Sequence, residues 1–148
     1  MKKNLIIKIL TVCLLMISNT AATQVNYLKE GINLFNKKEF DKSKILFEKD
    51  IVFDPKSETS YLYLAKIFKN KDNDEEQEIH LNNVLTLNPQ NEEAIYMLTL
   101  LRIKQFDYKG ARELIDQFVL VCKSFCSKKN EMQEKLEKLT PENAKTDN

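Results

Sequence analysis

The sequence predicts an all-α protein, an α-solenoid of three helical hairpins closed by a C-terminal capping helix. Three observations indicate this fold class. The 148 residues include only 2 Gly and 3 Pro, too few for the many turns of an all-β domain. Hydrophobic residues make up 43% of the chain, enough for one domain to bury a core. Similar residues also recur at a spacing of 34 positions, which is typical of stacked repeats.

The N-terminal segment, residues 1–22, has the features of a signal peptide. A basic start precedes an apolar run at 5–17, and Thr20 and Ala22 place small residues before a cleavage point ahead of Thr23. The apolar run is interrupted by a lysine and is shorter than the about 20 apolar residues of a membrane span, which disfavours an uncleaved anchor. We therefore expect export, and no stable membrane insertion after cleavage.

A lipoprotein site at Cys13 is disfavoured, because Val12 stands where a lipobox has a small residue and the apolar run continues past the cysteine. The abundance of Lys, Asn and Ile is typical of a bacterium with an AT-rich genome. Export would then lead to the periplasm or the exterior.

The charge balance argues against a nucleic-acid partner. The net charge is +1, and three lysines in the first 22 residues supply +3 of it. The remainder has 20 basic and 22 acidic residues, a balance of −2. A binding site for nucleic acid or an anionic membrane would show a basic excess.

The repeat is clearest around two prolines. Phe-Asp-Pro at 53–55 recurs as Leu-Asn-Pro at 87–89, and Tyr27 matches Tyr61 at the same spacing. Three copies fit the chain, at 24–57, 58–91 and 92–125.

These copies resemble tetratricopeptide repeats, whose 34-residue unit is a helix–turn–helix with small and aromatic residues at fixed positions and a closing proline. The first copy supplies Tyr27, Gly31, Phe40, Phe47 and Pro55. The second supplies Tyr61, Ala65, Phe68 and Pro89, and the third supplies Tyr108 and Ala111. The third copy has no closing proline, and four other positions depart from the pattern: Ser43, Asp74, Gln77 and Arg102.

Elementary chemistry supports the same hairpins. Proline lacks an amide hydrogen and forces the preceding residue out of the α region, so Asp54 and Asn88 should end helices. Gly31 and Ala65 are small enough for the second helix of each hairpin to approach the first closely. One hairpin cannot bury its apolar face alone, and about three stacked neighbours are the minimum.

Residues 126–140 should form the capping helix. Met132, Leu136 and Leu139 are spaced for one narrow apolar stripe on an otherwise charged helix, as a terminal cap requires. The last segment, 141–148, has almost no apolar residues and should be a frayed tail.

The resemblance implies a groove lined by the first helix of each hairpin. Its geometry assigns to this groove Val25, Leu28, Ile32, Phe35, Leu62, Lys66, Lys69, Tyr96, Leu100 and Ile103. A mostly apolar groove with a central basic strip should bind a protein or peptide partner. The alternative is that some of these residues pack against the cap or a neighbouring hairpin. Leu28 and Ile32 stand where one subclass has the lysine and asparagine that clamp a chaperone carboxylate, so that ligand is disfavoured.

Cys122 and Cys126 are the second candidate site. Outside the cytosol they should oxidise, and four residues of helix bring their Cα atoms to about 6 Å, within disulfide range. Such a bond is feasible where a helix kinks or ends, and a structural role at the junction to the cap is expected. A redox-active pair is the alternative, although the spacing is not that of thioredoxin-like sites.

The sequence contains no recognisable constellation for catalysis, a metal or a cofactor. His80 is the single histidine, and we expect it to be an exposed helical residue with no converging metal ligands. No Gly-rich phosphate loop or nucleophile elbow is present, so neither an enzyme nor a small-molecule substrate is indicated. The principal hypothesis is a peptide-binding scaffold of the envelope. The alternatives are a structural or self-associating subunit, and thiol or metal chemistry at Cys122 and Cys126.

Overall fold

The computed structural model describes residues 26–139, and this part of the chain consists of seven α-helices without a strand. The predicted signal peptide and the predicted tail at 141–148 lie outside the described residues. The helices are α2 (Tyr27–Asn36), α3 (Phe40–Phe53), α4 (Glu58–Asn70), α5 (Asp74–Leu87), α6 (Glu92–Lys104), α7 (Tyr108–Val121) and α8 (Lys128–Leu139).

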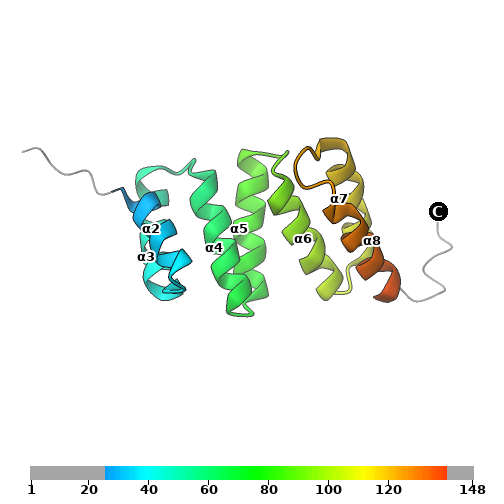
Figure 1. Cartoon of the computed structure of the whole chain (residues 1–148), viewed down its shortest axis with the longest axis horizontal. Helices are drawn as coiled ribbons and strands as arrows, with labels where there is room; N and C mark the ends of the chain where they lie inside the picture. Colours follow the sequence, from blue (N-terminus) through cyan, green and yellow to red (C-terminus); the bar gives the residue numbers. More distant parts are fainter. Residues whose placement is uncertain (1–25, 140–148) are drawn as a thin grey trace, which may run out of the picture.

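The helices pair into three successive hairpins, α2 with α3, α4 with α5, and α6 with α7. Figure 1 shows these hairpins side by side along the long axis of the molecule, with α8 at the end opposite α2. Each hairpin falls within one of the three predicted copies. The predicted fold class, an all-α solenoid, is therefore confirmed.

Side-chain caps set the start of four helices. Asn26, Asn73, Asn91 and Asp107 each accept a hydrogen bond from the backbone N–H three residues further on. Such caps satisfy an amide that has no partner within its own helix. Asn73 and Asp107 lie 34 residues apart, and each follows the turn inside its hairpin.

The ends of α3 and α5 have the backbone that the prolines impose. Asp54 has φ −128° and ψ 86°, and Asn88 has φ −141° and ψ 92°, both outside the helical region. Because Pro55 and Pro89 follow directly, neither helix can continue.

The turn inside each hairpin contains one residue in the left-handed region. Lys38, Asp72 and Phe106 have φ values of 62°, 51° and 62°, and they are spaced 34 residues apart. None of them is a glycine. The turn geometry thus repeats even where the side chains have nothing in common.

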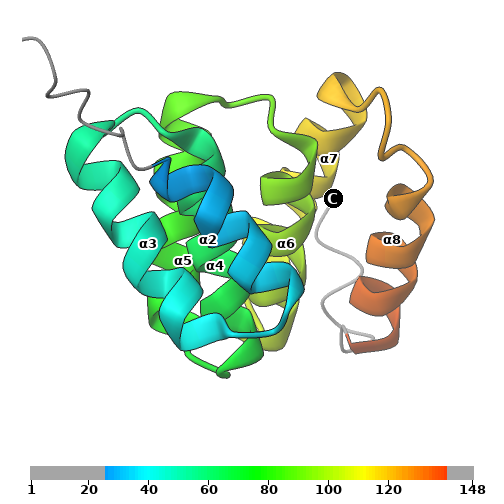
Figure 2. The ribbon, with the colours of Figure 1, turned by 60° about the vertical axis from the view of Figure 1, so that its left-hand side comes forward.

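The core divides into three clusters, each of which combines the two helices of one hairpin with the first helix that follows it. The first joins α2, α3 and α4 around Phe47, Leu64, Ile67 and Phe68. The second joins α4, α5 and α6 around Ala65, Leu81, Val84, Ala94, Met97, Leu98 and Leu101. The third joins α6, α7 and α8 around Ile95, Ile103, Ala111, Ile115, Phe118, Met132 and Leu136. Figure 2 shows α8 against the last hairpin, remote from α3.

Two of the departures from the repeat pattern are absorbed by polar contacts. Ser43, where alanine is usual, is fully buried, and its hydroxyl donates to the Gly31 carbonyl at 2.8 Å. Arg102, where an aromatic residue is usual, instead pairs with Glu78 of α5 at 2.6 Å. The Ser43 bond joins the two helices of the first hairpin, whereas the Arg102 pair joins α6 to α5 of the preceding hairpin.

One element of the predicted cap stripe is wrong. Met132 and Leu136 are buried in the third cluster, but Leu139 is 52% exposed. Leu139 is the last residue of α8, so the chain ends its contact with α6 and α7 one turn earlier.

Candidate functional site

The face formed by α2, α4 and α6 is hollowed in its middle. The larger hollow has a volume of about 490 Å³ and takes its walls from all three helices. Its lining residues are Phe35, Lys66, Lys69, Asn70, Glu93, Tyr96 and Met97.

A second hollow of about 320 Å³ adjoins the first. The two share Lys69 and Met97, and the second extends toward the cap, where Lys135 of α8 lines it. Its other lining residues are Asp72, Asp74, Gln77, Leu100, Leu101 and Lys104. We call the two hollows together the groove.

Five of the residues predicted for the groove do line it. Phe35, Lys66 and Tyr96 line the first hollow, Leu100 lines the second, and Lys69 lines both.

Three others are half-buried beside the groove and do not line either hollow. Leu28 and Ile32 pack against the first core cluster, and Leu62 packs against the second. Each of these side chains packs against the core on one side and is partly exposed to solvent on the other. Val25 lies outside the described residues.

The assignment of Ile103 to the groove is wrong. Its side chain is only 4% exposed and belongs to the third core cluster together with Met132 and Leu136. Repeat geometry places this position on the groove face, but α8 lies over it. The cap therefore removes the last turn of α6 from the groove.

Charge in the groove is largely paired. Lys66 Nζ lies 2.9 Å from a Glu93 carboxylate oxygen, which joins α4 to α6. Lys104 Nζ lies 2.7 Å from Asp74, and this hydrogen bond is the main cause of a raised pKa for Lys104. Among the described residues Lys69 has no acidic partner within 4.0 Å. Lys69, exposed and shared by both hollows, is the group whose charge is left for a ligand.

The cap contributes one wall through a hydrogen-bonded cluster. The Tyr96 hydroxyl donates to Glu131 at 2.8 Å, and Lys128 Nζ lies 5.3 Å from the centre of the Tyr96 ring. Lys128 and Lys135 both pair with Glu131, at 2.9 and 3.1 Å. Hydrogen bonds from Lys128, Tyr96 and Lys135, in that order, lower the pKa of Glu131 to about 2. The carboxylate thus stays ionised while it ties α6 to α8.

Phe35 of α2 lines the groove at its other end and packs against two further aromatic rings. The Phe35 ring lies edge-on to Tyr63 at 4.9 Å and to Phe40 at 5.3 Å. Lys66 Nζ lies 4.9 Å from the centre of the Tyr63 ring, within cation–π range.

Asn70, Glu93 and Met97 line the first hollow but are not among the predicted residues. Glu93 could have been found, because it precedes Tyr96 by three residues and so shares its helical face.

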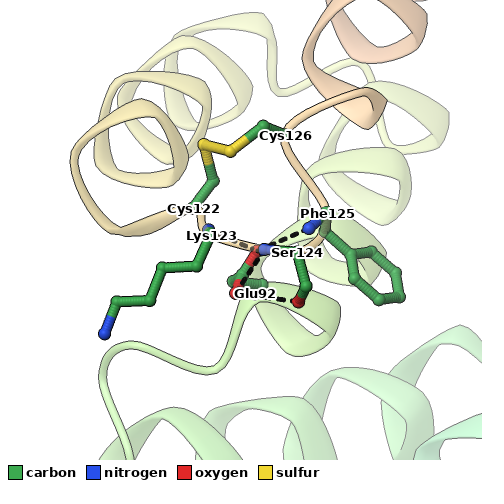
Figure 3. Close-up of a disulfide and its surroundings, with 6 residues drawn as sticks. All are labelled: Glu92, Cys122, Lys123, Ser124, Phe125 and Cys126. Atoms are coloured by element: carbon green, nitrogen blue, oxygen red, sulfur yellow. Dashed lines mark hydrogen bonds between the residues drawn. A yellow bond between two sulfur atoms is a disulfide. The ribbon is translucent and has the colours of Figure 1, made fainter.

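The candidate cysteine pair lies at the end of α7. Figure 3 shows Cys122 and Cys126 joined as a disulfide, with their Cα atoms 5.2 Å apart. Cys122 has φ −61° and ψ 137°, so α7 has already ended at Val121. This break in the helix provides the side-chain directions that a continuous helix would not allow.

The expectation for His80 is wrong, because its side chain is only 13% exposed. The ring stacks on Phe68 at 5.3 Å and lies 6.0 Å from the Tyr61 ring. Its Nδ1 is buried without a hydrogen-bond partner in the described part of the chain. Burial is the main effect on its pKa, which it lowers.

Within residues 26–139 no group of three or more His, Cys, Asp or Glu side chains could hold a metal ion. The same residues include no helix that is long and apolar enough to cross a membrane.

The described chain is an α-solenoid of helical hairpins, and comparison with known proteins makes this class more specific. No protein-family model and no curated protein matches the sequence. Among solved structures, the first TPR domain of Spaghetti (RPAP3), bound to the HSP90 peptide SRMEEVD, superposes with a TM-score of 0.68 at 15% identity. That similarity covers 76% of this chain and 92% of the other.

The Sgt2 TPR domain from Aspergillus fumigatus superposes with a TM-score of 0.61 at 20% identity, covering 76% of this chain and 74% of the other. The fold of this chain is thus the tetratricopeptide repeat fold, as its 34-residue pattern predicts.

Proposed function

We propose that this protein is a protein–protein interaction scaffold that binds a peptide segment of a partner in the groove. The observation that carries the proposal is the exposed, unpaired Lys69 at the junction of two hollows whose other walls include Phe35 and Leu100. A segment with an acidic residue flanked by apolar ones would match both features. Covering apolar surface contributes about 25 cal/mol per Å², and a carboxylate on Lys69 would add selectivity and faster association.

The structural neighbours support a peptide as the ligand. The RPAP3 domain has an HSP90 peptide bound, and that peptide is acidic. Leu28 and Ile32 replace the lysine and asparagine of a chaperone carboxylate clamp in this chain, so we propose a different peptide. A binding role also accords with a groove that offers charge and apolar surface rather than a nucleophile and base.

We further propose that the scaffold acts in the bacterial envelope, in the periplasm or outside the cell. The basic start, apolar run and small residues of the N-terminal segment support this location. The partner would then be another exported or envelope protein.

The test is capture and quantitative binding with a charge-reversed groove. A partner is first isolated from envelope extract by crosslinking, and its contacting segment is made as a peptide. Lys69→Glu should weaken binding of that peptide by about tenfold or more, because like charges then face each other. Lys109→Glu is the matched control, since Lys109 is an exposed lysine on α7 and lines neither hollow.

Equal affinity of both variants for the peptide would exclude the groove as its site. Circular dichroism should show both variants folded. Polar substitution of Ile32 or Leu100 is a poorer test than charge reversal, because both side chains pack against core clusters.

One observation favours self-association as a second function. Ile45, Val52 and Phe53 are exposed on α3 at helical spacing, and Phe53 stacks on Tyr27 at 5.5 Å. Sedimentation of the wild-type chain and of the Phe53→Ser variant measures the oligomeric state of each. A concentration-dependent dimer that Phe53→Ser abolishes would favour it over the scaffold acting as a monomer.

A further inference from the structure

The link between α7 and α8 comprises residues 122–127, and a covalent bond closes the five residues 122–126 into a loop. Cys122 follows the last residue of α7, Cys126 lies two residues before α8, and the disulfide joins them across three intervening residues. Figure 3 shows the loop folded around the side chain of Glu92, the first residue of α6.

Glu92 binds every backbone N–H between the two cysteines. One carboxylate oxygen, Oε2, accepts from Lys123 at 2.9 Å, Ser124 at 3.0 Å and Phe125 at 2.7 Å. The Ser124 hydroxyl donates to the other oxygen at 3.2 Å. Successive N–H groups that converge in this way form an anion-binding concavity. They lower the pKa of Glu92, with Phe125 as the largest contributor.

This convergence depends on a tightly curved backbone. A free loop samples many shapes and loses conformational entropy when three amides are turned toward one carboxylate. The disulfide excludes many of those loop conformations before the contact with Glu92 forms. The Glu92 contact and the Cys122–Cys126 bond therefore support each other.

The loop determines how α8 is attached to the rest of the protein. Phe125 packs against the third core cluster, and α8 follows three residues later with Met132 and Leu136 buried. Through this attachment α8 covers Ile103 and places Glu131 against Tyr96 at the edge of the groove. A looser loop would weaken the seating of α8.

The preceding hairpin has an equivalent contact without a disulfide. Glu58 lies 34 residues before Glu92, at the same repeat position. Its carboxylate accepts hydrogen bonds from the side chains of Asn88 and Asn91 in the loop that follows α5. A glutamate can thus hold an inter-hairpin loop on its own, and the cysteines make only the last such contact dependent on thiol chemistry.

We propose that Cys122–Cys126 is a thiol-exchange site that controls how firmly α8 closes the end of the array. Cys126 is exposed and Cys122 is half-buried, so a thiolate can reach the Cys126 sulfur. Attack by one sulfur of an external dithiol breaks the disulfide and releases the Cys122 thiolate, which takes up a proton. The second sulfur of the dithiol then displaces Cys126 as a thiolate. The dithiol becomes a disulfide, and two electrons and two protons reach the cysteine pair.

Hydrogen exchange followed by mass spectrometry tests this proposal on the full chain with Cys13→Ser, in which the only thiols are those of the pair. Iodoacetamide should label no thiol before treatment with dithiothreitol and two thiols after it. On reduction the amides of 123–125 and of α8 should exchange about tenfold faster, a change within the range that disulfides produce. Amides of α4 and α5 should be unaffected. The readout does not involve binding, so it is independent of the proposed function of the groove.

Variants distinguish a local effect of the disulfide on α8 from a general stabilisation of the whole protein. In the oxidised form Glu92→Gln should increase the exchange rates of the amides in 123–125 and α8. Reduction should then increase these rates less in the variant than in the wild type, because the substitution and the reduction disrupt the same contact. Glu58→Gln is the matched control and should loosen 88–91 without any response of that loop to dithiothreitol. Unchanged exchange in α8 after reduction would overturn the proposal. So would a uniform increase across all helices, or two thiols already free in chain recovered from an oxidising host.

Discussion

Gly31 of α2 lies directly against the ring of Phe47 of α3. A β-carbon placed on Gly31 would lie 2.8 Å from the nearest ring carbon, and Phe47 is fully buried and cannot move aside. Gly31→Ala should therefore destabilise the protein by about 1–3 kcal/mol, the usual cost of overpacking. The overlap exceeds the gain of up to about 1 kcal/mol that alanine brings to a helix interior. Urea unfolding measures the difference.

The matched rescue is Phe47→Leu, which removes the ring. Combined with Gly31→Ala, it should give a loss smaller than the sum of the two single losses, because the clash no longer exists. Strict additivity would show that the two residues do not limit each other.

Phe106 offers the opposite effect, a stabilising change. It has φ 62°, in the left-handed region that is unfavourable for a non-glycine residue, and its side chain is 72% exposed. The backbone is therefore strained while the ring gains little from burial. Asparagine tolerates this region better than other non-glycine residues. Phe106→Asn should raise the free energy of unfolding by about 0.5–1 kcal/mol. Phe106→Ala is the control, since it removes the ring without relieving the backbone, and it should not stabilise.

His80 should make stability depend on pH in the mildly acidic range. Burial lowers its pKa in the folded protein below the ordinary 6.5, against the raising effects of Glu76 and Glu48. As pH falls through 6.5, His80 becomes protonated in the unfolded chain but remains neutral in the folded protein. The free energy of unfolding therefore decreases. The decrease continues until pH passes below the folded pKa.

His80→Phe keeps an aromatic ring on Phe68 but cannot titrate. The melting temperature of the wild type should fall between pH 7.5 and 5.5 more steeply than that of the variant. Parallel curves for the two proteins would mean that His80 titrates alike in the folded and unfolded chains.

Export predicts a defined N-terminus. Chain recovered from an exporting bacterial host should begin near Thr23 on N-terminal sequencing, because Ala22 closes the predicted cleavage site. Intact Met1 chain in the membrane fraction would show instead that the segment is retained as an anchor.

Much of the fold could be predicted because proline, small residues and spacing act locally. Pro55 and Pro89 determine where two helices end, and Gly31 with Ala65 identifies the close faces of two hairpins. These effects extend over one hairpin and its neighbour. The 34-residue period of the sequence is therefore enough to predict these helix ends and helix contacts.

The candidate site was harder to predict because it depends on contacts between distant elements. Ile103 occupies a groove position by its period, yet α8 covers it. His80 follows a run of acidic residues that suggests an exposed face, yet its ring lies between α4 and α5 against Phe68. Glu92 has no local feature that indicates its bonds to a loop more than thirty residues away. The position of a residue within its repeat does not predict which side chains from other helices or loops will contact it.

Helices α4 and α6 each supply buried residues to two of the three core clusters, whereas α2 and α8 each contact one. A substitution in α4 or α6 must therefore suit neighbours on both sides, and one in a terminal helix must suit neighbours on a single side. Over evolutionary time the ends of the array should accept change readily while α4 and α6 diverge slowly. Since α4 and α6 also carry Lys66, Lys69 and Tyr96, any new ligand preference has to arise on the outward faces of the two helices that are least free to vary.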